Sequence, residues 1–64
     1  MSTEIQHLAN AITHGSYERA GAIVENLLVG PEHLTRDELL VQLRGFGIDE
    51  RRFDSAMHKA AEGS

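Results

Sequence analysis

The sequence predicts an all-α protein, a small bundle of four short helices that ends in a helix-turn-helix hairpin. Apolar residues recur at helical spacing in four separate stretches. Capping residues precede these stretches, and no stretch shows the alternation that a β-strand requires. With 64 residues, the chain has room for one helical domain, residues 1–64. We expect helices at about 4–14, 17–29, 36–44 and 50–61.

The first expected helix, 4–14, begins at a capping box in which Thr3 precedes Gln6 by three residues. Its apolar stripe consists of Ile5, Leu8, Ala9 and Ile12. Gly15 is expected to end this helix, and Ser16 can cap the next one directly. The alternative is one long helix that is kinked at Gly15.

The second expected helix, 17–29, has the widest apolar arc in the chain. Its members are Tyr17, Ala20, Ile23, Val24, Leu27 and Leu28. Gly30 and Pro31 end the helix, because a proline cannot continue the hydrogen-bond ladder and pushes its predecessor out of the helical region. This helix is expected to be the most buried of the four.

The third expected helix, 36–44, has the clearest start. Thr35 and Glu38 form a capping box, in which each side chain can bind a backbone amide of the other residue. Leu34 and Leu39 have the spacing of a hydrophobic staple over the first turn. The pattern therefore predicts that a helix begins directly after Thr35.

The hairpin turn and the fourth helix, 50–61, follow at once. Gly45 is expected to be the left-handed residue that ends the third helix, with Phe46 folding back on that helix. Asp49 is the expected N-cap of the fourth helix, and Ile48 and Phe53 form a second staple. The apolar stripe of this helix is Phe53, Ala56, Met57 and Ala60.

The inward members of the four stripes predict the core. They are Leu8, Ile12, Val24, Leu27, Leu39, Leu43, Phe53 and Met57. A chain this short buries only about 60% of its unfolded surface, and it has no cysteine to form a disulfide. Tyr17 and Leu28 lie at the edge of the apolar arc of the second helix, and Val29 and Val41 lie near or beyond the core stripes. We therefore expect a symmetric homodimer that buries part of the second helix.

Charge and composition favour a cytoplasmic protein. The chain has 6 Lys and Arg residues against 10 Asp and Glu residues, a formal net charge of −4. This charge works against non-specific attraction to phosphate or to anionic lipid. No stretch approaches the roughly 20 apolar residues of a membrane span, and the first residues do not form a signal peptide. We expect no contact with a membrane.

The sequence predicts no catalytic, metal or cofactor site. Ser55 and His58 are i, i+3 neighbours, but both fall on the outer face of their helix, where nothing excludes water. His58 also has Asp54 and Glu62 at i−4 and i+4, which favours ordinary surface pairing. His7 and His14 are about 10 Å apart along their helix, too far for the i, i+4 chelation of one ion.

A helix-turn-helix could instead bind DNA, with helix 50–61 as the reading helix. Arg51, Arg52, Ser55 and Lys59 are expected to be exposed there. Acidic residues lie among them, however, and the chain as a whole is acidic, whereas affinity for duplex DNA comes mostly from phosphate neutralisation. DNA binding is therefore the alternative interpretation.

Two segments resemble a known family. From Gly21 the chain reads GAIVENLL, and from Leu34 it reads LTRDELL, with Leu43 following. These segments are similar to the G-x-[IA]-V-x-x-[IL]-L and L-[ST]-R-x-x-L helices of the small YmgB/AriR/YcgZ family of bacterial regulators. The resemblance implies a non-enzymatic helical dimer that links stress or two-component signalling to biofilm control by binding another protein, such as a signalling or transcription regulator.

Overall fold

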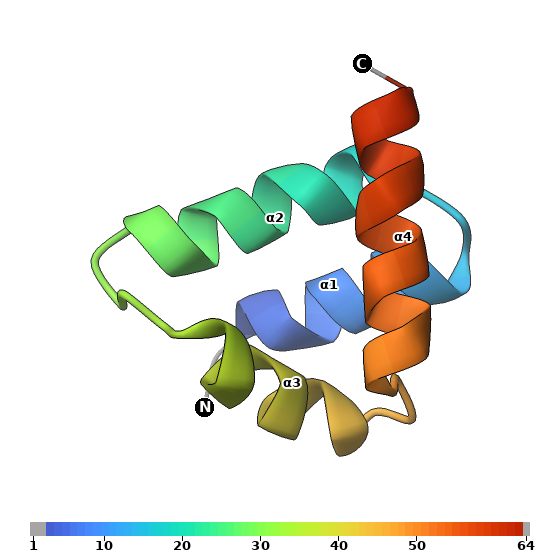
Figure 1. Ribbon diagram of the computed structural model, residues 1–64. Helices are drawn as coiled ribbons and strands as arrows, with labels where there is room; N and C mark the ends of the chain where they lie inside the picture. The colour runs from blue at the N-terminus through green and yellow to red at the C-terminus, as the bar shows by residue number, and fades with distance from the viewer. Residues whose placement is uncertain (1–2, 64) are drawn as a thin grey trace.

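The computed structural model describes residues 3–63. Within this range the chain forms four α-helices and no β-strand: α1 (Thr3–Thr13), α2 (Tyr17–Val29), α3 (Arg36–Arg44) and α4 (Glu50–Glu62). In Figure 1, α1 and α2 run in opposite directions, α3 lies below α1, and α4 stands across the right-hand side. The all-α prediction is confirmed, and every helix boundary falls within one residue of the expected position.

The corner between α1 and α2 is a Schellman turn. Gly15 has a φ of +78°, and the amide of Ser16 donates to the carbonyl of Ala11 at 2.8 Å. The alternative of one kinked helix is therefore excluded. Ser16 occupies the N-cap of α2, but its side chain makes no capping hydrogen bond. Thr3 is already helical, so it does not cap α1, and the residues before it lie outside the described range.

The start of α3 matches the predicted capping box. The amide of Glu38 donates to the Thr35 hydroxyl at 3.2 Å, and the amide of Thr35 donates to the Glu38 carboxylate at 3.2 Å. Leu34 packs against the core, and its amide donates to the carbonyl of Leu27 at 3.0 Å. This bond ties the loop before α3 to the end of α2.

α3 ends at Arg44 as predicted, but the left-handed residue of the turn after it is Gly47 and not the predicted Gly45. Gly45 has a φ of −62°, an ordinary helical value, whereas Gly47 is left-handed with a φ of +83°. The amide of Ile48 donates to the carbonyl of Leu43 at 3.1 Å, which places the Schellman turn at Gly47. Ile48 is 1% exposed and Phe46 is 50% exposed. The left-handed residue therefore lies two positions later than expected, and Ile48 rather than Phe46 folds back onto the core.

Asp49 caps α4 as predicted, since its carboxylate accepts a hydrogen bond from the amide of Arg52 at 2.8 Å. Phe53 and Ile48, the two residues of the predicted staple, are both buried. The hairpin between α3 and α4 is thus held by a Schellman turn on one side and an aspartate cap on the other. None of the described helices has the length and apolar character that crossing a membrane requires.

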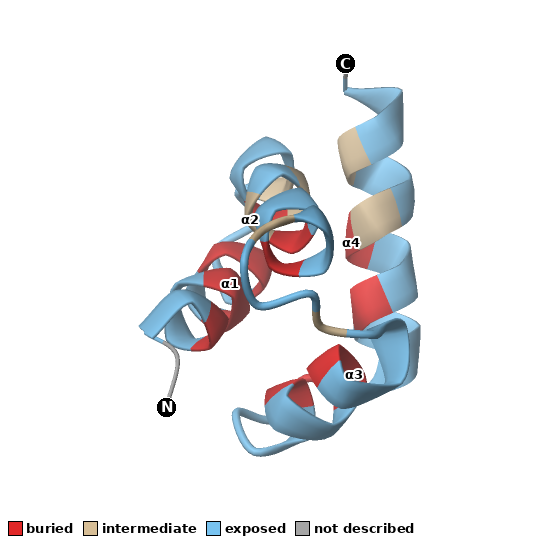
Figure 2. Ribbon diagram, turned by 90° about the vertical axis from the view of Figure 1, so that its left-hand side faces the viewer, coloured by how far each residue is buried: buried red, intermediate tan, exposed pale blue. Residues whose placement is uncertain are grey.

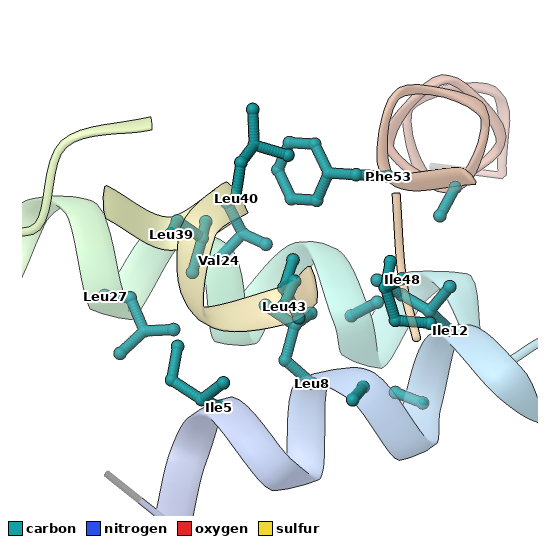
Figure 3. Packing of buried hydrophobic residues seen from close by; sticks show 14 residues of the cluster. Ile5, Leu8, Ile12, Val24, Leu27, Leu39, Leu40, Leu43, Ile48 and Phe53 are labelled. Carbon is teal, nitrogen blue, oxygen red and sulfur yellow. The ribbon is translucent and has the colours of Figure 1, made fainter. Parts of the chain in front are cut away.

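The core is a single cluster to which all four helices contribute (Figure 2). Figure 3 shows the side chains of Leu8 and Leu43 pointing toward each other, and the ring of Phe53 beside Leu40. The buried residues are Ile5, Leu8, Ala9, Ala11, Ile12, Ala20, Val24, Leu27, Leu39, Leu40, Leu43, Ile48, Phe53 and Ala56. Seven of the eight predicted core residues are among them. Met57 is the exception, because it only packs against the edge of the cluster.

The close crossing of α2 and α4 depends on small residues. A Cβ atom added to Gly21 would lie 3.2 Å from the Cβ atom of Ala60. Ala20 and Ala56 are also fully buried, at 0% and 1% exposure. α4 can therefore pack directly on α2, which covers much of the apolar arc that was expected to face a second chain.

Candidate interaction surface

The eight predicted interaction residues lie in three places. Five of them, Tyr17, Arg51, Arg52, Ser55 and Lys59, surround the start of α2 and the adjoining face of α4. Leu28 and Val29 lie at the opposite end of α2, about 16 Å from Tyr17 along the helix axis. Val41 lies on α3, where it lines a shallow hollow with Leu40 and Glu50. The structure therefore does not bring the predicted residues onto one surface.

Tyr17 is the centre of the first group. Its ring is partly buried against the core, and the ammonium of Lys59 lies 5.1 Å from the ring centroid. This distance is within the range of a cation–π interaction. The two residues are 42 positions apart in the sequence, and the crossing of α2 and α4 brings them together.

Two open hollows meet at Tyr17. The smaller has a volume of about 230 Å³ and is lined by Ile12, Tyr17, Arg51, Arg52, Ser55 and Ala56. The larger has a volume of about 580 Å³ and is lined by Gly15, Ser16, Tyr17, Glu18, Arg19, Lys59 and Gly63. Tyr17 is the residue that lines both hollows. We use the name Tyr17 surface for Tyr17, the four cationic side chains that line one hollow or the other, and Ser55; its members are Tyr17, Arg19, Arg51, Arg52, Ser55 and Lys59. Arg19 is an addition to the predicted set.

The Tyr17 surface concentrates positive charge in an acidic protein. It holds four of the six Lys and Arg residues of the chain, whereas among residues 3–63 Glu18 is the single carboxylate that lines the two hollows. The guanidinium of Arg52 also donates to the carbonyl of Gly47 at 3.3 Å, which holds this side chain near the start of α4. The surface is therefore positive, although the formal net charge of the chain is −4.

Arg36 pairs with two carboxylates of α4 that would otherwise oppose this charge. Its guanidinium donates to Asp54 and, at 3.4 Å, to Glu50, and it lies 5.8 Å from the ring centroid of Phe53. The hydrogen bond to Asp54 is the main reason that the pKa of Arg36 is raised above its ordinary value, and the charges of Asp54 and Glu50 add to it. Because the pKa of Arg36 is raised in the folded protein, its contribution to the free energy of unfolding is present at lower pH and is lost as the pH rises through the raised pKa.

Exposed carboxylates gather at the other end of the molecule. The start of α1, the end of α2 and the start of α3 meet on the left of Figure 1 and face the viewer in Figure 2. These segments and the loop between α2 and α3 carry Glu4, Glu25, Glu32, Asp37 and Glu38, all of which are exposed. The protein thus has an acidic end and, around Tyr17, a basic one.

The exposed apolar side chains are separate from the Tyr17 surface. Leu28 is 38% exposed, and Val29 and Val41 are each 68% exposed. Phe46, in the loop between α3 and α4, is 50% exposed and was not predicted to be so. In the middle of the α2 arc Ala20, Val24 and Leu27 are buried, whereas Leu28 at one end is exposed and Tyr17 at the other end is half-buried.

The other chemically active side chains form no compact centre. Ser55 and His58 are exposed on α4; His58 pairs with Glu62 at 3.2 Å, while Asp54 binds Arg36 instead. His7 and His14 line one hollow of about 270 Å³ on α1 and the corner after it. Among residues 3–63, no three potential metal ligands lie close enough together to hold an ion.

Comparison with known proteins identifies no relative. No family model matches the chain, and neither a curated protein nor a solved structure is significantly similar to it.

Proposed function

We propose that the chain is a small, non-enzymatic, cytoplasmic regulatory protein that acts by binding another protein. The Tyr17 surface is the observation that carries this proposal. It combines a partly buried aromatic ring with three arginines and a lysine on α2 and α4. Tyrosine and arginine are the residue types that most often dominate the binding energy of protein interfaces.

The resemblance to the YmgB/AriR/YcgZ family supports the same class of function. A protein of that family would be a dimeric connector of stress and biofilm signalling. The exposed apolar residues at the end of α2, Leu28 and Val29, offer a separate surface for a second copy of the chain. One surface would then hold the dimer and another the regulated protein.

Affinity capture from the cytoplasm of the source organism tests the proposal. Tagged wild-type protein should retain one specific protein in near-stoichiometric amount. The matched control is Leu27→Ala, which removes a core side chain that is 1% exposed and should prevent folding. If wild type retains nothing beyond what this variant retains, the proposal is contradicted.

DNA binding through α4 is the second candidate function. Arg51, Arg52 and Ser55 are exposed in the first two turns of α4, and Arg36 pairs with two nearby carboxylates, Glu50 and Asp54, and so offsets part of their negative charge. A duplex-binding protein, however, gains most of its affinity from many phosphate contacts. Only four cations line the Tyr17 surface, and the acidic end of the molecule would be repelled by the phosphate backbone.

A further inference from the structure

We propose that the Tyr17 surface binds an acidic segment of a partner protein, in which carboxylates flank a single large apolar side chain. This inference rests on the proposed function and specifies the chemistry of the partner. The carboxylates would pair with Arg19, Arg51 and Lys59, and the apolar side chain would enter the smaller hollow beside the Tyr17 ring.

Charge complementarity identifies the occupant as acidic. Four cationic side chains from α2 and α4 line the two hollows, and Glu18 is the only carboxylate of the described residues in their lining. Two further carboxylates of α4, Glu50 and Asp54, are bound to Arg36. An incoming carboxylate therefore meets a positive field, which raises the rate of association and fixes the orientation of the segment.

The smaller hollow explains why one apolar side chain should accompany the carboxylates. Its walls include Ile12 and Ala56, both of which belong to the core, together with the ring of Tyr17. A hollow of about 230 Å³ has room for a side chain such as leucine. Anchoring one apolar group in a pocket with a charged rim is the usual construction of a small interface.

Two other occupants fit less well. A second copy of this chain could offer its own acidic end, but such a contact joins two different surfaces and builds a ring or an open chain of molecules instead of the expected symmetric dimer. Duplex DNA presents a rigid backbone with evenly spaced phosphates and no apolar side chain to fill the hollow. A protein segment satisfies both the charges and the hollow.

Fluorescence anisotropy at low salt tests the inference on the full-length protein. The probe is a fluorescein-labelled dodecapeptide in which glutamates flank a central leucine, and its twin has glutamine in place of every glutamate. Wild type should bind the acidic probe saturably and the twin at least about tenfold more weakly. The variant R51Q should weaken binding of the acidic probe about threefold, and R51Q combined with K59Q about tenfold.

The matched control is R44Q, which removes the same charge from an exposed position at the end of α3, outside the Tyr17 surface. It should leave the affinity for the acidic probe unchanged. All three substitutions are at exposed positions, and circular dichroism checks that each variant is folded. Absence of saturable binding, equal binding of the glutamine twin, or an equal loss in R44Q overturns the inference.

Two further measurements separate the other occupants. If an unlabelled DNA duplex displaces the probe at lower concentration than unlabelled peptide does, the surface binds nucleic acid and the inference is wrong. If R51Q abolishes self-association in sedimentation equilibrium, a second copy occupies the surface and the inference is again wrong. If the peptide fails to bind while affinity capture still retains a partner, the proposed function stands and this surface is not the site.

Discussion

Gly21 and Ala60 set the distance between α2 and α4, because a Cβ atom on Gly21 would lie 3.2 Å from the Cβ atom of Ala60. Gly21 follows Tyr17 by one helical turn, and Ala60 is the neighbour of Lys59. The close approach of α2 and α4 at these two small residues therefore also places the Lys59 ammonium 5.1 Å from the centroid of the Tyr17 ring. A packing requirement between two helices thus positions the candidate interaction surface.

The first prediction concerns this crossing. Replacing Gly21 with leucine should destabilise the fold by about 1–3 kcal/mol, because the added side chain forces α2 and α4 apart. The chain has one tyrosine and no tryptophan, so tyrosine fluorescence during thermal unfolding reports on the surroundings of Tyr17 alone. The matched control is Ala22→Leu, one residue further along α2 at an exposed position. Equal melting temperatures for the two variants would show that the crossing is not tight.

The second prediction concerns the core. Leu27 is 1% exposed, whereas its neighbour Leu28 is 38% exposed. Leu27→Ala should cost about 2–5 kcal/mol, and a core of this size supplies only about 3–5 kcal/mol, so the variant should be largely unfolded. Leu28→Ala should retain its helical circular dichroism signal at low protein concentration. An unchanged melting curve for Leu27→Ala would contradict the burial of α2.

The third prediction separates the two glycines at the end of α3. Gly47 has a φ of +83° and open space where a Cβ atom would lie, so Gly47→Ala should cost about 1 kcal/mol through backbone strain alone. Gly45 has a helical φ of −62°, and an added Cβ atom would lie 3.3 Å from the carbonyl oxygen of Gln42. Gly45→Ala should have the smaller effect in a denaturant titration. A larger loss of stability for Gly45→Ala than for Gly47→Ala would instead place the left-handed residue at Gly45, as the sequence predicts.

Local signals in the sequence were sufficient to predict the helices. The capping box of Thr35 and Glu38 and the cap at Asp49 each involve residues three positions apart, so their geometry follows from the residue types. The left-handed residue after α3 could not be predicted in the same way, because Gly45 and Gly47 are both able to take that position. The choice between them depends on whether Phe46 or Ile48 reaches the core, and only the packed structure decides this.

The candidate surface could be predicted only in part. Exposure on α4 follows from helical periodicity, which identified Arg51, Arg52 and Lys59. Their grouping with Tyr17 and Arg19 depends on the angle at which α4 crosses α2, and no sequence spacing encodes that angle. The bond from Arg36 to Asp54 was missed for the same reason, since 18 residues separate the two partners. The expected pairing of Asp54 with His58 is replaced by this bond.

The fourth prediction concerns self-association. Sedimentation equilibrium at micromolar concentration should give a dimer, and the melting temperature should rise with protein concentration by mass action. Val29 and Val41 are equally exposed, at 68%, but only Val29 adjoins another exposed apolar residue of α2. Val29→Glu should therefore shift the equilibrium toward monomer, while Val41→Glu should leave it unchanged. A monomer mass with concentration-independent melting would rule out the dimer.

Titration of a labelled DNA duplex with wild-type protein tests most directly whether the chain acts through protein or through DNA. Low salt is the condition that favours DNA binding, because it strengthens every phosphate contact. If the chain acts by binding another protein, the fluorescence anisotropy of the duplex should stay flat, or rise only weakly and without saturation, up to high micromolar concentrations of the chain. Tight, saturable binding that both Arg51→Glu and Arg52→Glu abolish would contradict it and establish α4 as a DNA-reading helix.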